Sequence, residues 1–515
     1  MQAEISLEQR RKEIIDLVSE NNLIIELRAV EMLSKEDSYK NFIQEFVQEQ
    51  KFVIDFNSLE QKIIQTKTKM DVITPEIEII NSNFKPISKE YSADIREMID
   101  YNITNQSYSV GKVKDFIAMF QDKFESTQQM FKGRENLAPK PISKLKTVTK
   151  NKEVDVIAMV DKKWISKNGH LILELEDMEA RCIGVAMKDD KKIFEFAKNV
   201  LPDNVIAVKA VKATDEMIII KEIFFPELPQ RGVKKAERDL AACVISDIHV
   251  GSKQFLEKEF YKFLSWLKGD CSDKEKKKVG KIKYLFVLGD NVDGIGVYPD
   301  QIDNLAIKNI YTQYEAFTDI MKLIPEHIEV IIIPGQHDAS RRNEPQPAIP
   351  KEYVKELYEL GNFHFLSSPG WVEVEGLKTL MYHCSSMHDM IESVNNLSND
   401  KPATAMIEYL KRRNLMPTYG MKNPYVPEKK DYMLIREPPD LFLGGDLHHN
   451  DFALHRGTMV VSGGTWQERT DFEVRIGNIP TPGICTTIEL KTSNVSFTSF
   501  YKQQKYLGFE VTSYE

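Results

Sequence analysis

The stretch ACVISDIHVGS, residues 242–252, joins a short apolar run to polar residues that can bind a metal ion. The run from Cys243 to Ser246 is typical of a buried strand, and Asp247 and His249 follow it closely. Positions i and i+2 of an extended backbone point to the same side, so these two side chains can aim at one point. A carboxylate beside an imidazole suits a transition-metal ion, although a single such pair is more often a turn cap beside a surface histidine.

The same kind of strand end recurs four more times along the chain. Apolar runs in KYLFVLGDNVDG, EVIIIPGQHD, LKTLMYHCSS and DLFLGGDLHHN are followed by Asp290, by Gln336, His337 and Asp338, by His383, and by Asp446, His448 and His449. Only His170 of the ten histidines precedes His249. Because sites in layered α/β sheets form at strand ends, the sequence predicts one site where several strands end.

This order of motifs resembles the calcineurin-like metallophosphoesterase superfamily, whose pattern is D-x-H, G-D-x-x-D, G-N-H-[DE], an isolated His and G-H-x-H. The flanking stretches IIIKEIFFPELP, residues 218–229, and PGQHDASRRNEPQPAIP, residues 334–350, are similar to the small subunit of archaeal D-family DNA polymerases. The likeness spans roughly residues 140–500. In that family the phosphoesterase domain is a 3′–5′ exonuclease, and the resemblance implies this activity.

The resemblance also implies a site for two divalent metal ions. Carried over motif by motif, Asp290 bridges both ions, Asp247, His249 and His448 bind the first, and Gln336, His383 and Asp446 bind the second. His337 is expected to be catalytic, facing the substrate and helping the leaving oxygen. Asp293 and Asp338 are expected to hold loops and ligands in place.

Two positions depart from the superfamily pattern. Gln336 stands where the superfamily has Asn, and Asp446 stands where the last motif has its first His. The longer side chain of Gln336 can carry its carbonyl oxygen ~1.5 Å further out, and a misplacement of ~1 Å can cost ~10²-fold in rate. A hard oxygen ligand at Asp446 favours Mn²⁺ or Mg²⁺ over Zn²⁺. We therefore expect a slow nuclease that works best with Mn²⁺.

The chain of 515 residues is too long for one ordinary core. Helical spacing predicts a helical module in residues 1–70, and residues 71–140 are interpreted as an extended connector around Pro75 followed by a helix. Short strands with one helical piece predict an OB-fold barrel in residues 141–235. The predicted fold is α/β, with a calcineurin-like phosphoesterase β-sandwich flanked by helices in residues 236–515.

Composition limits where DNA can be contacted and in which compartment the chain works. The net charge is -9 and the isoelectric point is near 5.8, whereas DNA-binding domains are usually basic. DNA contacts must therefore be local or shared with a basic partner. Five scattered cysteines without a CxxC pair indicate a reducing, cytoplasmic setting. No apolar run approaches the ~18 residues of a membrane span, so no membrane contact is expected.

Several stretches are candidates for contact with DNA or a partner. The lysine-rich run 274–283 is expected to be a solvated loop more often than a phosphate-binding patch. The stretch between His383 and Asp446 is expected to overhang the site. The remaining candidates, each of which could equally have only a structural role, are Trp164 with Lys162, Lys163 and Lys167 in the barrel, and Arg341 with Arg342.

Three classes of function fit these patterns. The first is a metal-dependent 3′–5′ exonuclease that proofreads as the small subunit of a two-subunit replicative DNA polymerase. Its partners would be the large catalytic subunit and single-stranded or mismatched 3′ ends of DNA. The second is a scaffold subunit that keeps the fold without the activity, and the third is a phosphoesterase for small nucleotides or phosphoproteins. Retention of nearly every ligand type argues against the second, and the barrel and helical module argue against the third.

Overall fold

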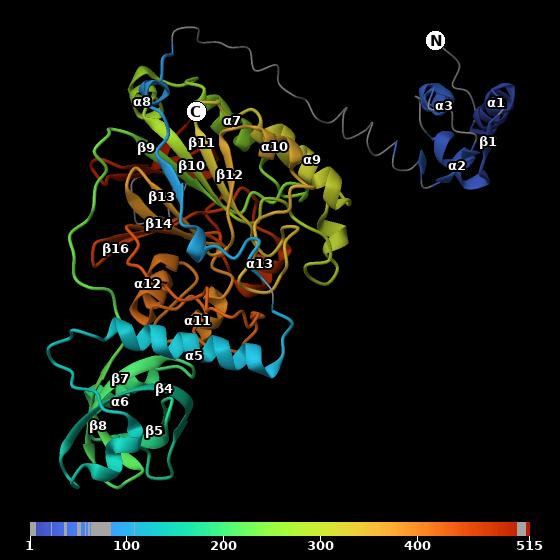
Figure 1. The fold of residues 1–515 in the computed structure, drawn as a ribbon. Helices are drawn as coiled ribbons and strands as arrows, with labels where there is room; N and C mark the ends of the chain where they lie inside the picture. The colour runs from blue at the N-terminus through green and yellow to red at the C-terminus, as the bar shows by residue number, and fades with distance from the viewer. Residues whose placement is uncertain are drawn as a thin grey trace. The chain divides into compact units, whose positions relative to one another are not determined.

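The structure of the chain is a computed structural model (Figure 1). It describes residues 7–21, 23–35, 39–48, 53–56, 58–59, 62, 84–107, 109–501 and 511–514. The chain divides into two compact units, Met1–Ile80 and Asn81–Glu515. The domain boundary predicted at residue 70 and the connector predicted around Pro75 lie outside the described residues.

The first unit has a small core of its own. Its elements are α1 (Leu7–Glu20), β1 (Ile24–Ile25), α2 (Leu27–Leu33), α3 (Tyr39–Gln48) and β2 (Val53–Ile54). Ile14 and Val18 of α1 lie one turn apart and are both buried, and Phe42 and Phe46 repeat this spacing in α3. The helices agree with the helical spacing of the sequence. The two short strands, which pair in parallel, were not predicted.

The second unit contains a closed five-stranded barrel. Its strands are β4 (Glu153–Ile165), β5 (Leu171–Glu176), β6 (Arg181–Ala186), β7 (Val205–Lys212) and β8 (Met217–Phe224), in the order β4-β5-β6-β8-β7. The helix α6 (Lys191–Lys198) lies between β6 and β7 in the chain. Val156, Ala158 and Val160 alternate along β4 and point into the core, as expected for a strand whose inner face is buried. The predicted barrel and its helical piece are therefore present.

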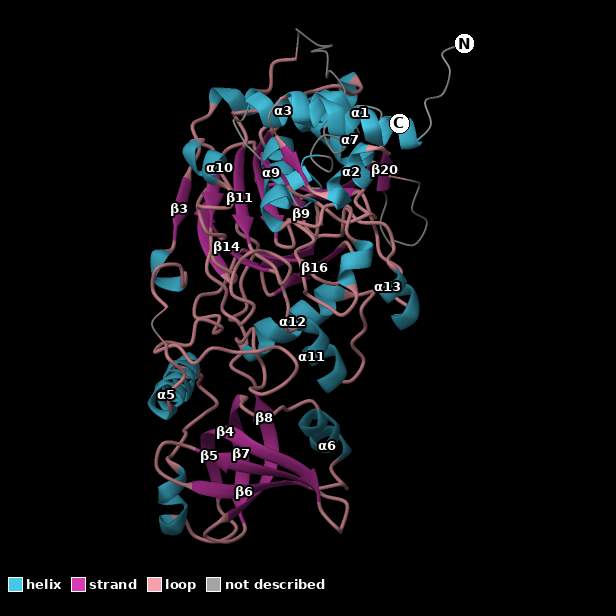
Figure 2. Cartoon of the chain, turned by 90° about the vertical axis from the view of Figure 1, so that its right-hand side faces the viewer, coloured by secondary structure: helices cyan, strands magenta, loops and turns pink. Residues whose placement is uncertain are grey.

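Two further sheets carry the strand ends singled out in the sequence (Figure 2). The seven-stranded sheet has the order β12 (Phe363–Phe365), β11 (Glu329–Ile333), β10 (Ile282–Leu288), β9 (Ala241–Ile245), β18 (Ile484–Glu489), β19 (Val495–Ser499) and β20 (Val511–Ser513). The six-stranded sheet has the order β16 (Asp451–His455), β17 (Thr458–Ser462), β15 (Leu441–Gly444), β14 (Leu377–Tyr382), β13 (Gly370–Val374) and β3 (Ile95–Glu97). In the first sheet, β9, β10 and β11 pair in parallel.

The two sheets pack against each other and are covered by helices on their outer faces. Val244 and Phe286 of the first sheet share one core with Leu443 and Val461 of the second, whereas Cys243 faces the outer helices. The outer helices of the first sheet are α7 (Glu257–Leu267), α9 (Ile310–Met321) and α10 (Lys355–Glu359), and those of the second are α5 (Val113–Met130), α11 (Met387–Ser393) and α12 (Pro402–Arg412). Short helices complete the unit, namely η1 (Ile87–Glu90), η2 (Ile99–Tyr101), η3 (Ile142–Thr147), α8 (Asp273–Val279), η4 (Gln301–Asn304) and α13 (Asp471–Ile476).

Two stretches differ from their sequence-based interpretation. The lysine-rich run 274–283 is not a solvated loop, because it forms most of α8 and the start of β10, and Lys283 is buried with its ammonium group donating to the carbonyl of His327. The strand β3 lies in the segment interpreted as connector and helix, yet it pairs with β13 of the six-stranded sheet. No helix in the part of the chain that the structure describes is long and apolar enough to cross a membrane.

Candidate metal centre

Five strands place the predicted site residues at one edge of the two sheets. Each strand stops one to three residues before the first ligand-type side chain. Asp247 and Asp290 adopt left-handed φ angles of 53° and 49°, and His249, Asp446 and His448 do so as well. Left-handed backbone is strained for residues other than glycine and concentrates at functional sites. The local strain therefore points to a site that the rest of the fold holds together.

The first group of side chains gathers around Asp247. The Nε2 atom of His448 lies 3.4 Å from Oδ1 of Asp247, and the Nε2 atoms of His448 and His249 lie 3.2 Å apart. The other ring nitrogen of each histidine contacts a carboxylate. Nδ1 of His249 lies 3.0 Å from Asp293, and Nδ1 of His448 lies 3.0 Å from Glu473. Carboxylates in these positions fix the ring orientation and leave Nε2 of both histidines facing the same point.

The second group gathers around Asp290 and Asp446. The Nε2 atom of His383 lies 3.4 Å from Oδ1 of Asp290 and 3.8 Å from Oδ1 of Asp446, and its Nδ1 contacts the carbonyl of Leu288 at 2.7 Å. The amide of Gln336 donates to Asp446 over 2.7 Å. A side chain at Gly335 would place its Cβ 2.2 Å from Oδ1 of Asp290, so glycine is required there for this approach.

His337 occupies a position between the two groups. Its Nδ1 donates to the carbonyl oxygen of Asp293 over 2.6 Å, and its Nε2 lies 3.7 Å from Oδ2 of Asp290. Its ring meets the ring of His249 edge-on, with 4.8 Å between centroids. The side chain lines the cleft at the strand ends, so Nε2 can reach a molecule bound there.

The buried charges at this edge are balanced between carboxylates and imidazoles. Burial by itself would raise the pKa of Asp290, but His383, His337 and His249 hold it well below its ordinary value. Burial would lower the pKa of His448, but Asp247 and Glu473 raise it well above its ordinary value. Asp290 is therefore a carboxylate, which is the form that binds a cation.

The donor set fits divalent metal ions. Three groups of side chains bring their ligand atoms within 4.8 Å of one another, namely Asp247 with His249 and His448, Asp247 with Asp290 and His383, and His249 with Asp293 and His337. Three buried atoms here have no hydrogen-bond partner among the described residues, namely Oδ1 of Asp247, Nε2 of His383 and Oδ2 of Asp446. Buried polar atoms without partners are costly, and cations bound at the sheet edge would supply partners for them.

The cleft at the strand ends also contains residues that the motifs did not single out. It has a volume of about 270 Å³ and is lined by His249, Asp290, Asp293, Val297, Tyr298, Gln336, His337, Arg342, His388, Asn399, Asp446, Leu447, His448, Gln467, Thr470, Phe472, Glu473 and Asn478. His388 had no predicted role, yet its Nε2 lies 3.5 Å from Oδ2 of Asp446. Its place five residues after His383 was the only available signal.

Some of the other residues singled out in the sequence have a structural role, whereas Arg342 lies where it can contact a ligand. Arg341 is held by Glu428 and by the carbonyl of Pro345, whereas Arg342 lines the cleft. Asp338 accepts hydrogen bonds from backbone amides of its own loop and the neighbouring one. The ammonium group of Lys163 donates to two backbone carbonyls, so it is not available to track phosphates beside the half-exposed Trp164.

The stretch between His383 and Asp446 overhangs the site only in part. His388 and Asn399 line the cleft, whereas the Pro- and Lys-containing segment 422–432 does not. That segment packs beside α5, where the backbone N–H of Asp431 donates to Asp122 over 2.6 Å. Its Tyr425 is buried in the core between α5, α12 and the six-stranded sheet.

The amino-acid sequence of this chain is similar to one protein-family model and to several known proteins. The family model for the B subunit of DNA polymerases alpha and epsilon matches residues 243–454, which contain all the predicted metal ligands. The class indicated is that of accessory subunits of DNA polymerases. The chain is 36% identical to the DNA polymerase II small subunit of Methanocaldococcus jannaschii over 420 residues, which are 81% of this chain and 70% of that protein.

Two further relatives carry the same name. The small subunit of Methanothermobacter thermautotrophicus is 37% identical over 74% of this chain and 78% of its own length. The small subunit of Thermoplasma acidophilum is 30% identical over 95% of this chain and 93% of its own length. The chain therefore belongs to the family of archaeal DNA polymerase II small subunits.

Proposed function

We propose that this chain is the 3′–5′ exonuclease subunit of a two-subunit replicative DNA polymerase and removes mismatched nucleotides from 3′ ends. The observation that carries the proposal is the gathering of the predicted ligands at the strand ends, where three buried ligand atoms have no hydrogen-bond partner among the described residues. Its large catalytic partner would carry out synthesis, as the names of the relatives imply for them. The barrel, interpreted as an OB-fold, would lie beside the DNA or that partner.

The ligands are assigned to two divalent ions, for which Mn²⁺ is the first choice and Mg²⁺ the second. Asp290 lies between both groups of side chains and is the proposed bridging ligand. The first ion would be held by Asp247, His249 and His448, and the second by Gln336, His383 and Asp446. Two ions held by these residues would neutralise the charge of a phosphodiester and make a water molecule a better nucleophile.

The side chains around the ions would orient the substrate and move the proton. Hydrogen bonding of Nδ1 to the carbonyl of Asp293 keeps the proton of neutral His337 on that atom. Its Nε2 would then take up a proton from the attacking water and pass that proton to the leaving 3′ oxygen. Arg342 lines the same cleft and can donate two hydrogen bonds to a phosphate.

The test is cleavage of an end-labelled single strand of DNA with Mn²⁺ and with EDTA. Wild type is expected to shorten the strand from its 3′ end only with Mn²⁺, and Asp290→Asn is expected to abolish cleavage while circular dichroism stays unchanged. Asp303→Asn, which changes an aspartate outside the cluster, is the matched control. If wild type binds no second ion and cleaves nothing, the scaffold function replaces the exonuclease. If Asp290→Asn cleaves normally, the two-ion assignment is wrong.

A further inference from the structure

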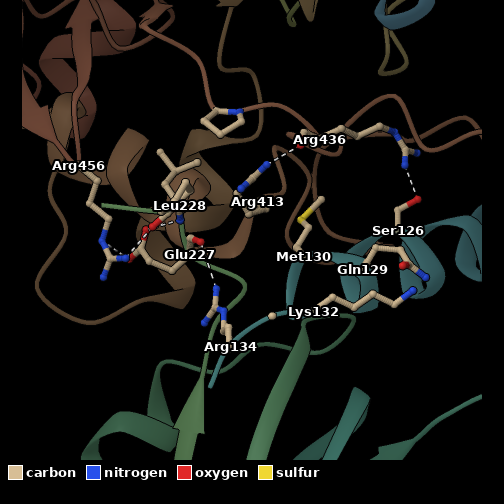
Figure 3. A pocket seen from close by; sticks show the side chains of 13 residues that line it. Ser126, Gln129, Met130, Lys132, Arg134, Glu227, Leu228, Arg413, Arg436 and Arg456 are labelled. Carbon is tan, nitrogen blue, oxygen red and sulfur yellow. Dashed lines mark hydrogen bonds and ion pairs between the residues drawn. The ribbon is translucent and has the colours of Figure 1, made fainter. Parts of the chain in front are cut away.

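A second cavity lies where α5, the segment after the barrel and the six-stranded sheet region meet (Figure 3). Its volume is about 800 Å³, within the range of ~300–1,000 Å³ that is usual for sites of small molecules and cofactors. It is lined by Ser126, Gln129, Met130, Lys132, Gly133, Arg134, Glu227, Leu228, Pro229, Arg413, Arg436, Pro438 and Arg456. It shares none of these residues with the cleft at the strand ends.

The lining is strongly basic although the chain as a whole is acidic. Five of the residues that line the cavity are Lys or Arg and only Glu227 is acidic, in a chain of net charge -9. Arg436 is paired with Asp122, and Nε of Arg456 lies 3.8 Å from Glu227. Glu227 also contacts His455 at 3.0 Å, so its charge is shared. The cavity therefore concentrates positive charge that its own carboxylates do not balance.

Arg413 is the cation whose burial is hardest to explain without a ligand. Its side chain donates to the carbonyls of Ile435 and Arg436 over 2.6 Å each, and no carboxylate among the described residues lies within 4.0 Å of its charged nitrogens. It is only 4% exposed. Burial lowers its pKa to about 10, so the group still carries its charge at neutral pH. Glu437 and Glu227 act on this charge only from beyond ion-pair distance, and an anion in the cavity would supply a close counter-charge.

Arg134 is held in a similar way. Its guanidinium donates to the backbone carbonyls of Phe225, Pro226 and Glu227, and it lies over the ring of Phe131 at 4.8 Å. Bonds to carbonyls fix the direction of the side chain, whereas Glu227 acts on its positive charge only from beyond ion-pair distance. Lys132, two residues before it, is exposed and has no carboxylate partner among the described residues. Arg134 and Arg413 are thus oriented before any ligand arrives, which reduces the entropy lost on binding.

We propose that this cavity binds a phosphate-bearing ligand, either a free nucleotide or the backbone of a single DNA strand. Guanidinium groups match the oxygens of a phosphate in a planar, two-pronged geometry. A di- or triphosphate, or successive phosphates of a strand, can reach several cations at once, which a single carboxylate cannot. Met130, Pro229 and Pro438 in the lining offer apolar surface to a base or sugar. This site is independent of the proposed exonuclease site.

The test measures binding by the full chain in EDTA, where divalent ions cannot hold phosphates at the strand ends. The probes are dATP, tripolyphosphate, a fluorescent oligo-dT and a poly-glutamate peptide, and their binding is measured by calorimetry or anisotropy. Lys132→Gln and Arg456→Gln are each expected to weaken binding roughly tenfold, because a hydrogen bond to a charged group contributes about that much. Lys274→Gln, which removes an exposed lysine of α8, is the matched control and should bind like wild type.

The probes also separate the two sources of phosphate. Binding of dATP without oligo-dT would identify a nucleotide site, and binding of oligo-dT in preference to dATP would identify a path for a DNA strand. The proposal is overturned if neither variant differs from Lys274→Gln in its affinity. It is also overturned if only a poly-glutamate peptide binds, because the cavity would then take a protein segment. Lys132 is exposed, so its variant tests the idea even if Arg456→Gln fails to fold.

Discussion

Replacing Glu344 by Gln should change how the stability of this chain depends on pH. Glu344 is fully buried and neither of its carboxylate oxygens has a hydrogen-bond partner among the described residues. Burial raises its pKa from 4.5 to about 8, although Ser385, His383 and Arg341 act in the opposite direction. In the unfolded chain this carboxyl would ionise at its ordinary pKa, whereas in the folded chain it keeps its proton until about pH 8.

The sign and size of the effect follow from this difference. The folded state binds more protons than the unfolded state between pH 4.5 and about 8, so the free energy of unfolding falls as pH rises through this window. The stabilisation is fully present below 4.5 and is lost above about 8. At ~1.36 kcal/mol for each pKa unit, the loss is at most about 5 kcal/mol. An amide cannot ionise, so Glu344→Gln should lack this part of the pH dependence.

The assay is urea unfolding of wild type and variant in EDTA at about pH 5.5 and about pH 8.5. Wild type should lose stability relative to Glu344→Gln on going to the higher pH, by a few kcal/mol. Glu352→Gln, at an exposed position, should follow wild type at both values. Equal pH dependence in wild type and Glu344→Gln would mean that the buried carboxyl ionises normally, and the argument from burial would be refuted.

Three further predictions concern the site and the assembly. His337→Ala should keep its bound metal, measured by mass spectrometry, while turnover falls about 10²–10⁴-fold, and a parallel loss of metal would make His337 a ligand. Gln336→Asn combined with Asp446→His should at least preserve the single-turnover rate of cleavage with Mn²⁺, and a fall in that rate would show that the chain has adapted to its own residues. Removal of residues 1–70 should leave co-purification with the large subunit intact, and its loss would place the contact in the helical module.

Much of the fold was predictable because the signals for it are local. The strand β9 is buried on both faces, and its continuous apolar run Ala241–Ile245 reports this directly. The five barrel strands and α5 also agree with their sequence periods. The strand β3 was not predictable, because it has three residues, two of them charged, and its partner β13 lies more than 270 residues away. Such a strand is defined by its pairing and not by its composition.

The contacts that support the site were also not predictable from the sequence. The residues that make them belong to local patterns that indicate something else. In the sequence TDFE, Thr470 and Glu473 form the pattern of a helix start. The structure has this capping box at α13, and Oε2 of Glu473 accepts from the backbone N–H of Thr470 over 2.9 Å. The other oxygen of Glu473 holds Nδ1 of His448, and these charge-assisted contacts lower its pKa to about 2 despite burial. The carboxylate of Glu473 therefore caps the start of a helix and also orients a proposed metal ligand. Only the capping role can be predicted from the sequence.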